Sequence, residues 1–184
     1  MKKTIQTLAM AAIAVVSMTS CEDDDTPQII NEEEVITTVT YTLTNAVDNT
    51  DRVILRSVDA DGDGTIDMES VSGPLTSGAN YNGEVRFENE LESPTENITE
   101  EVIEEGDEHE VFYTTTVSGV SISKTDTDVN GDPLGVMTTI NTGAAGTGVL
   151  TIVLRHEPSK PNDGTLSGAG GETDIQVSFN VAVQ

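Results

Sequence analysis

The sequence predicts an all-β fold, an antiparallel β-sandwich with one short helix, on three observations. Short runs rich in Val, Ile, Thr and Tyr alternate apolar and polar residues, which is the period of a half-buried strand. Clusters of Gly, Asn, Asp and Pro separate most of these runs, as turns require. Helical periodicity is prominent in only one segment, so the alternating strand and helix series of an α/β protein is missing.

The strand candidates follow one another from residue 35 to the end of the chain. The first, VITTVTYTLT, places Val35, Val39, Tyr41 and Leu43 on one face. About 150 residues are enough for one domain with its own core, so we predict a single β-sandwich domain at 35–184. The remaining candidates are 53–58, 68–71, 81–88, 111–117, 120–124, 135–142, 149–156 and 174–183.

The one helix is predicted in the segment SPTENITEEVIEEG. Ser93 or Thr95 can cap it, and acidic residues occupy its first turn. Ile98 and Val102 lie one turn apart and are expected to face the sheet, and the final glycine is well placed to end the helix. Much of the Gly- and Pro-rich chain between 154 and 174 is expected to be a long loop.

Residues 1–20 have the features of an export signal, with two lysines, an apolar run and small residues at the end. The run is too short to span a bilayer, which takes roughly 20 apolar residues. The signal ends at Cys21, the sole cysteine, and Met18 to Cys21 resembles the lipobox of bacterial lipoproteins. That resemblance implies that Cys21 becomes the N-terminus and carries acyl chains that anchor the protein in a membrane. A free thiol is the alternative.

Residues 21–34 are acidic and have no apolar periodicity, so we expect a tether after the lipidated cysteine. The tether resembles the acidic one of Bacteroidota surface lipoproteins, which is associated with delivery to the outer face of the outer membrane. A plain solvated linker is the alternative. The whole chain has 33 acidic and 8 basic residues and a formal net charge of -25. Such a charge repels nucleic acid and attracts cations and basic partners.

An aspartate-rich loop begins at Asp59 and resembles the first nine positions of an EF-hand calcium loop, with oxygen ligands at alternate positions and a glycine at the sharp turn. It departs from that motif at the twelfth position, which is Ser70. A similar run begins at Asp126, but Pro133 replaces its inward apolar residue. An acidic turn without an ion is the alternative. The candidate Ca²⁺ ligands are Asp59, Asp61, Asp63, Asp67 and the Thr65 carbonyl.

The stretch EEGDEHEVFY gathers carboxylates around one of the two histidines, His109. Like charges one turn apart, and carboxylates at a helix C-terminus, both oppose helix stability. No Lys or Arg occurs between Arg86 and Lys124, so a bound cation would supply the missing compensation. His156 shares strand phase with the apolar residues before it. The candidate ligands are His109, His156, Glu104, Glu105 and Glu108, a set suited to Zn²⁺ or another transition metal. A solvated helix end with two unrelated histidines is the alternative.

Motifs for catalysis are weak. Ser121 and Lys124 match an S-x-x-K string but lie on a predicted strand, and the chain has no nucleophile elbow, no HExxH and no usable thiol. Aromatic residues make up 3% of the chain and Trp is absent, which disfavours a platform for stacking sugars. We therefore expect a non-enzymatic protein. A glycan-active enzyme is kept as a further alternative.

Five segments resemble a family of small lipoproteins from marine Bacteroidota, and the resemblance covers nearly all of the mature chain. They are residues 31–39, the Asp59 loop, residues 105–113, 154–158 and 171–175. Some members carry the label of a type 1 periplasmic-binding fold, and some are expected near TonB-dependent receptors. This sequence lacks the alternating strands and helices that the label implies, so the fold prediction remains all-β.

These observations together predict a lipid-anchored binding protein at the outer membrane or cell surface. Its expected ligand is a cation, zinc-like at His109 and His156 or Ca²⁺ at the Asp59 loop, or else a small molecule. The resemblance implies service to a TonB-dependent receptor. The alternative is a structural or adhesive surface lipoprotein whose loops are stiffened by calcium.

Overall fold

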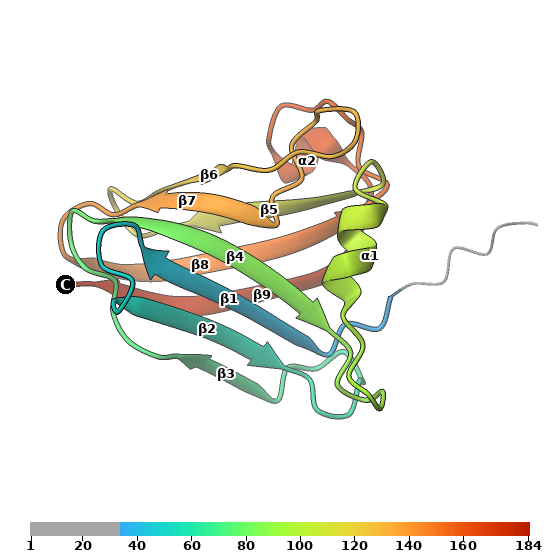
Figure 1. Ribbon diagram of the computed structural model, residues 1–184, viewed down its shortest axis with the longest axis horizontal. Helices are drawn as coiled ribbons and strands as arrows, with labels where there is room; N and C mark the ends of the chain where they lie inside the picture. The colour runs from blue at the N-terminus through green and yellow to red at the C-terminus, as the bar shows by residue number, and fades with distance from the viewer. Residues whose placement is uncertain (1–33) are drawn as a thin grey trace, which may run out of the picture. The chain divides into compact units, whose positions relative to one another are not determined.

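The computed structural model describes residues 34–184, so the predicted signal peptide, Cys21 and almost all of the predicted tether lie outside the described residues. The strands within 34–184 are antiparallel and form two facing sheets (Figure 1), which confirms the predicted sandwich. One sheet has the order β3-β2-β1-β4-β7-β6 and the other β5-β8-β9. The strands are β1 (Thr38–Asn45), β2 (Arg52–Val58), β3 (Met68–Val71), β4 (Asn80–Glu88), β5 (His109–Thr115), β6 (Ser121–Lys124), β7 (Met137–Asn141), β8 (Gly146–His156) and β9 (Glu172–Val183).

Every predicted strand is present, with its ends shifted by a few residues. The alternation in β1 buries Val39, Tyr41 and Leu43 completely. Val35, which the sequence places on the same face, is 51% exposed because β1 begins only at Thr38. The prediction for Val35 is therefore wrong, while the period of two that identified the strand is confirmed.

The core fills the space between the two sheets. Its largest side chains include Tyr41, Tyr81 and Phe179, all of which are almost fully buried. Burying such a side chain stabilises the fold by roughly 1.5–3 kcal/mol. The two tyrosine hydroxyls also have partners, because Tyr41 bonds Thr138 Oγ1 at 2.6 Å and Tyr81 donates to Asp51 at 2.6 Å.

The predicted helix is α1 (Ile98–Glu104), which lies at one end of the sandwich (Figure 1). Ile98 and Val102 are buried against the core, as the sequence predicts. The predicted cap at Ser93 or Thr95 is wrong, because the helix begins several residues later with Asn97 as its N-cap residue. Its first turn has no side-chain cap, so packing of the apolar face is what holds this short helix.

Basic side chains from distant parts of the chain compensate the acidic stretch after α1. Lys160 Nζ donates to the Gly106 carbonyl at 2.5 Å, just beyond the helix C-terminus, where a positive charge is favourable. The same ammonium pairs with the buried Asp128 at 3.0 Å, and Lys124 pairs with Glu110. The sequence-based argument that this stretch lacks basic compensation is therefore wrong, since tertiary structure supplies it.

The loop predicted between β8 and β9 is present and contains one short turn of helix, α2 (Leu166–Ala169). Ala169 and Leu166 pack on Phe112 and Val153, so this segment covers part of the outer face of the three-stranded sheet. Across residues 34–184, neither helix has the length or apolar character needed to cross a membrane.

Candidate functional site

The two histidines of the chain face each other across a pair of strands. His109 is the first residue of β5, and in the antiparallel register of β5 and β8 it pairs directly with His156. Both point into the sandwich, because each is in phase with the buried apolar residues of its own strand. Their rings stack with centroids 4.8 Å apart and an interplanar angle of 24°. The predicted meeting of His109 and His156 therefore occurs.

A β-bulge brings a carboxylate to this pair. Leu154 pairs with Ile175 and Arg155 pairs with Thr173, so Asp174 is an extra residue on β9. A bulge re-aims the side chain of the extra residue. Asp174 is accordingly almost buried, with 4% of its side chain exposed, and its Oδ1 lies 3.8 Å from His156 Nδ1.

The turn into β9 also requires a glycine next to the histidines. Gly171 has a φ of 70°, and a Cβ atom there would lie 2.3 Å from the His156 carbonyl oxygen. Any larger residue would push the chain away from His156. Gly171 thus allows the chain to pass close to His156 before it enters the bulge.

Two further groups reach His109 from outside the three-stranded sheet. Its Nδ1 lies 3.1 Å from the Glu105 carbonyl oxygen at the end of α1. A carbonyl can only accept, so Nδ1 carries a proton, and in the neutral ring Nε2 then bears the lone pair. Nε2 lies 3.2 Å from Glu34 Oε1. The His109 side chain is fully buried and 8% of the Glu34 side chain is exposed.

The contact between His109 Nε2 and the Glu34 carboxylate is unfavourable unless a positive charge lies between the two groups. The neutral His109 ring would turn a lone pair toward the Glu34 carboxylate in a buried setting, where such repulsion is strong. Burial by itself lowers the pKa of His109, but the Glu34 carboxylate, the Glu105 carbonyl and the charge of Asp174 outweigh burial and raise it. The site therefore favours a proton on Nε2.

The spacing of the donor atoms is close to that of metal ligands. One ligand atom from each of His109, His156 and Asp174 lies within 4.8 Å of the others, and the same is true of Glu34, Glu105 and His109. Ligands on a tetrahedral ion with bonds of about 2.0–2.1 Å are about 3.3 Å apart. The measured 3.2 Å and 3.8 Å between imidazole nitrogens and carboxylate oxygens fall near that value. His109 belongs to both groups of potential ligands, one with His156 and Asp174 and the other with Glu34 and Glu105.

The other predicted ligands of this site divide into two groups. Glu105 lies beside Glu34 and His109, and its carboxylate is exposed. Glu104 and Glu108 are exposed and belong to neither group of potential ligands. In their place the structure supplies Asp174 and Glu34, which the sequence-based search missed. Strand alternation puts Asp174 out of phase with the buried side chains of β9, so only the bulge turns it inward.

The predicted calcium loop is held together by its own backbone. Asp59 accepts from the Gly62 amide at 2.8 Å and from the Gly64 amide at 2.7 Å, one on each carboxylate oxygen. Burial of Asp59 acts to raise its pKa, but these amide bonds outweigh burial and lower it. Asp59, Asp61 and Asp67 form a group that could hold a cation. Asp63 lies outside that group and accepts from the Thr65 amide at 2.8 Å.

The second aspartate-rich loop is organised by a lysine. Asp128, whose side chain is fully buried, accepts from the backbone amides of Asn130 and Asp132 at 2.9 Å. It also pairs with Lys160, of whose side chain only 6% is exposed. The ammonium therefore stands where a calcium ion would be needed, and the contacts of Asp128 are those of a structural ion pair.

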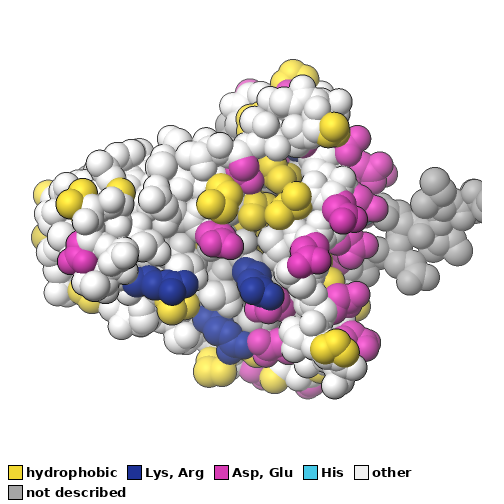
Figure 2. All heavy atoms as spheres, in the orientation of Figure 1, with side chains coloured by type: hydrophobic (Ala, Val, Ile, Leu, Met, Phe, Trp, Pro, Cys, Tyr) yellow, Lys and Arg dark blue, Asp and Glu magenta, His cyan; other side chains and the backbone are white. Residues whose placement is uncertain are grey.

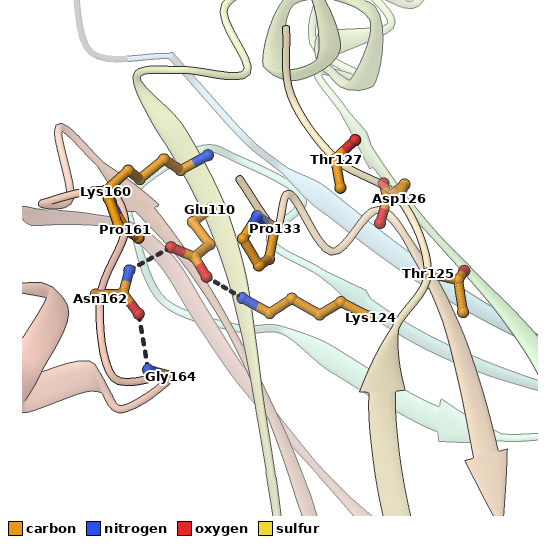
Figure 3. A pocket seen from close by; sticks show the side chains of 10 residues that line it. All are labelled: Glu110, Lys124, Thr125, Asp126, Thr127, Pro133, Lys160, Pro161, Asn162 and Gly164. Carbon is orange, nitrogen blue, oxygen red and sulfur yellow. Dashed lines mark hydrogen bonds and ion pairs between the residues drawn. The ribbon is translucent and has the colours of Figure 1, made fainter. Parts of the chain in front are cut away.

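A hollow of about 380 Å³ lies beside this loop and contains paired charges (Figure 3). Glu110, which is 2% exposed, accepts from Asn162 Nδ2 at 2.6 Å and pairs with Lys124. The Lys124 ammonium also lies 4.1 Å from the centre of the Phe112 ring. Burial lowers the pKa of Lys124, and the contact with Glu110 partly opposes that effect. Each buried charge at the base of this hollow already has a partner.

Comparison of the chain with models of protein families, with curated proteins and with solved structures finds no match.

Proposed function

We propose that this protein is a lipid-anchored, non-enzymatic protein of the outer membrane that binds one divalent transition cation, with Zn²⁺ as the reference ion. The cation site consists of His109, His156, Asp174 and Glu34. The observation that carries the proposal is the stacked, buried histidine pair with a carboxylate on each side. Two imidazoles and two carboxylates are a ligand set that suits zinc.

The tautomer of His109 supports ligation through Nε2. Ligating histidines generally donate their other ring N–H to a carbonyl or carboxylate, which fixes the ring and raises its basicity. His109 Nδ1 has that partner in the Glu105 carbonyl, at 3.1 Å. The end of α1 therefore orients the imidazole that faces Glu34 and His156.

The charge of the site supports a divalent ion. Two carboxylates and two neutral imidazoles carry a formal charge of about minus two, which one divalent cation neutralises without a remaining buried charge. Additional acidic groups lie around the proposed site. Burial, together with the nearby charges of Glu34, Glu105 and Glu96, raises the pKa of Glu101. The surrounding field thus favours cations over anions.

The membrane location in the proposal rests on sequence alone. The signal at 1–20, Cys21 and the acidic tether support export and lipid anchoring at the outer membrane, facing outward. Delivery of the cation to a TonB-dependent receptor is the proposed purpose of the binding. Glu34 connects the two parts of this hypothesis, because it is the last residue of the predicted tether and also a proposed ligand.

A structural role with calcium is the second proposed function. The observation in its favour is the group of Asp59, Asp61 and Asp67. The amide bonds to Asp59 hold the loop without an ion, so calcium would add stiffness and would leave the path of the chain unchanged. Affinities of extracellular calcium modules reach down to about 10⁻⁴–10⁻³ M, and a site of this kind would belong to that class.

Zinc and calcium titrations of the purified protein separate the two functions. Calorimetry is expected to show one zinc per chain, and Co²⁺ substitution is expected to give the intense visible absorption of a tetrahedral ion. His109→Ala, His156→Ala and Asp174→Asn should each weaken zinc binding by at least about 100-fold, since loss of even an outer partner of a ligand costs about 10–100-fold.

Matched variants make the zinc result specific. Glu104→Gln and Glu108→Gln remove the same charge from exposed positions close in sequence to His109, and they should change zinc affinity by less than about threefold. Asp61→Ala should affect calcium alone. Zinc binding that survives both histidine substitutions would sink the proposed cation site, and a calcium-dependent rise in melting temperature without zinc binding would favour the structural function.

A further inference from the structure

Three side chains with complementary chemistry meet at the hollow of Figure 3. Glu110 lies on β5 with only 2% of its side chain exposed, and its two carboxylate oxygens contact two different partners. Oε1 accepts from the Lys124 ammonium at the end of β6. Oε2 accepts at 2.6 Å from Asn162 Nδ2, in the loop between β8 and β9. One buried carboxylate therefore holds an amine and a carboxamide from distant parts of the chain.

The surroundings of Lys124 favour its action as a nucleophile. Only 19% of its side chain is exposed, and its ammonium lies 4.1 Å from the centre of the Phe112 ring. Burial, and to a smaller extent the charge of Lys160, lowers the pKa of Lys124, so the reactive neutral amine forms more easily there than in water. Figure 2 shows many exposed acidic side chains at the end of the molecule that α1 covers, so a solvated lysine would not lack partners. The placement of Lys124 beside one buried carboxylate therefore favours a local chemical role.

The carboxamide of Asn162 is held in a fixed orientation. Its Nδ2 donates to Glu110 and also to the Ser159 carbonyl at 3.0 Å, while its Oδ1 accepts from the Gly164 amide at 2.8 Å. These partners establish which end of the side chain carries the nitrogen. The Gly164 N–H can stabilise negative charge that develops on Oδ1 when a nucleophile attacks Cγ. The nitrogen that would leave faces the Glu110 carboxylate.

We propose that Lys124 and Asn162 join in an intramolecular amide bond, with Glu110 as the proton carrier. Nζ of Lys124 forms a bond to Cγ of Asn162, the bond between Cγ and Nδ2 breaks, and ammonium leaves. Nζ loses two protons and Nδ2 gains two through Glu110, so Glu110 ends as a carboxylate and no further reactant is needed. Lys124 and Asn162 reach the carboxylate from opposite sides, so Nζ crosses the hollow between them, as the flexible lysine stem allows.

The bond would fasten one sheet of the sandwich to the other. Lys124 ends β6 of the six-stranded sheet, and Asn162 belongs to the loop that joins β8 and β9 of the three-stranded sheet. The chain has a single cysteine, so a disulfide within the chain cannot serve this purpose. A covalent link restricts the unfolded chain and thereby stabilises the fold. This role is independent of the cation site at the histidines.

Tryptic digestion of the denatured full chain in EDTA, followed by mass spectrometry, tests the proposal. Without the amide, trypsin cuts after Lys124 and Arg155 but not between Lys160 and Pro161, which gives the peptides 87–124, 125–155 and 156–184. The amide blocks cleavage after Lys124 and joins 87–155 to 156–184, with a mass lower by one ammonia, about 17 Da. We expect this joined peptide in most molecules. Three separate peptides would overturn the proposal, and so would a loss of about 17 Da within 156–184 alone, which marks cyclisation of Asn162 on its own backbone.

Variants assign the roles of the three side chains. Lys124→Arg, Asn162→Ala and Glu110→Gln should each abolish the joined peptide. Glu110→Gln is the sharpest of them, because both joined residues remain and only the proton carrier is lost. A joined peptide that persists in Glu110→Gln would refute the proton transfer, and one that persists in Lys124→Arg would refute the bond itself.

Lys160→Arg is the matched control. Lys160 is also nearly buried and paired with an acid, Asp128, but the other partners of that carboxylate are backbone amides and include no carboxamide. The joined peptide should be as abundant in Lys160→Arg as in the unsubstituted protein, and its loss there would contradict the assignment to Lys124. The digest of the unsubstituted chain decides the proposal even where a variant fails to fold.

Discussion

The pair of His109 and Glu34 predicts an unusual pH dependence for the stability of the metal-free protein. The raised pKa of His109 means that the folded protein holds its proton more tightly than the unfolded chain does. The pair therefore contributes its full stability below about pH 6.5, the ordinary histidine pKa, and loses that contribution as the pH rises through the folded-state pKa. Metal affinity should change in the opposite direction, because a metal competes with this proton.

The substitution Glu34→Gln measures the size of this contribution. His109 is fully buried and only 8% of the Glu34 side chain is exposed, so at pH 5.5 the loss of one partner belongs with broken buried pairs, which cost about 3–5 kcal/mol. We expect about 3 kcal/mol, because Glu34 lies close to the surface. At pH 9 the neutral ring turns a lone pair toward the carboxylate, so the substitution removes no attraction and should cost less than about 1 kcal/mol. The effect of the substitution should thus be larger at pH 5.5 by about 2 kcal/mol.

Urea unfolding in EDTA, followed by far-UV circular dichroism because the chain lacks Trp, measures both values. For a domain of this size, 2 kcal/mol corresponds to a difference of about 4–8 °C in melting temperature. Glu69→Gln, an exposed acid on β3, is the control and should behave alike at both pH values. If Glu34→Gln costs the same at pH 5.5 and pH 9, then Glu34 does not hold a proton on His109, and the electrostatic account of the site is refuted.

Three further substitutions test other parts of the fold. Lys160→Met should lower the free energy of unfolding by about 3 kcal/mol in urea, because it leaves the buried Asp128 with backbone amides alone. A cost below about 1 kcal/mol would contradict the compensation described for the acidic stretch. Gly83→Ala should lower stability by about 1–3 kcal/mol, because the new Cβ atom would lie 2.4 Å from Thr138 Oγ1; an unchanged melting temperature would show that the sheet relaxes freely. Asp59→Asn should lower the melting temperature at pH 7 and lower it less at pH 3. A carboxylate with a lowered pKa stabilises the fold above its ordinary pKa and loses this effect on acidification. Equal effects at both pH values would show that the negative charge of Asp59 does not stabilise the loop.

The strands and the inward direction of both histidines could be predicted from the sequence, because a period of two is a local property. His156 is in phase with Leu150, Ile152 and Leu154, and all four are buried. The meeting of His156 with His109 could not be predicted in the same way. It depends on the register of β5 with β8, and that register is set by the packing of the whole sandwich.

The remaining errors have physical causes of the same kind. Asp174 faces the histidines because one extra residue in β9 reverses the alternation, and no residue type in the sequence announces that bulge. The acidic stretch is compensated by Lys160, more than fifty positions further along the chain. Local charge identifies an acidic stretch that needs compensation, but the compensating lysine comes from a distant part of the chain.

The charges around the two histidines bear on which cation the proposed site would prefer. A single proton on His109 carries one positive charge, whereas two nearly buried carboxylates, Glu34 and Asp174, lie close to the histidine pair. A divalent ion at the proposed site would neutralise both carboxylates at once, because imidazoles are neutral as metal ligands. We therefore expect the affinity of the proposed site for a divalent metal to rise as the pH passes through the raised pKa of His109, where the competing proton leaves.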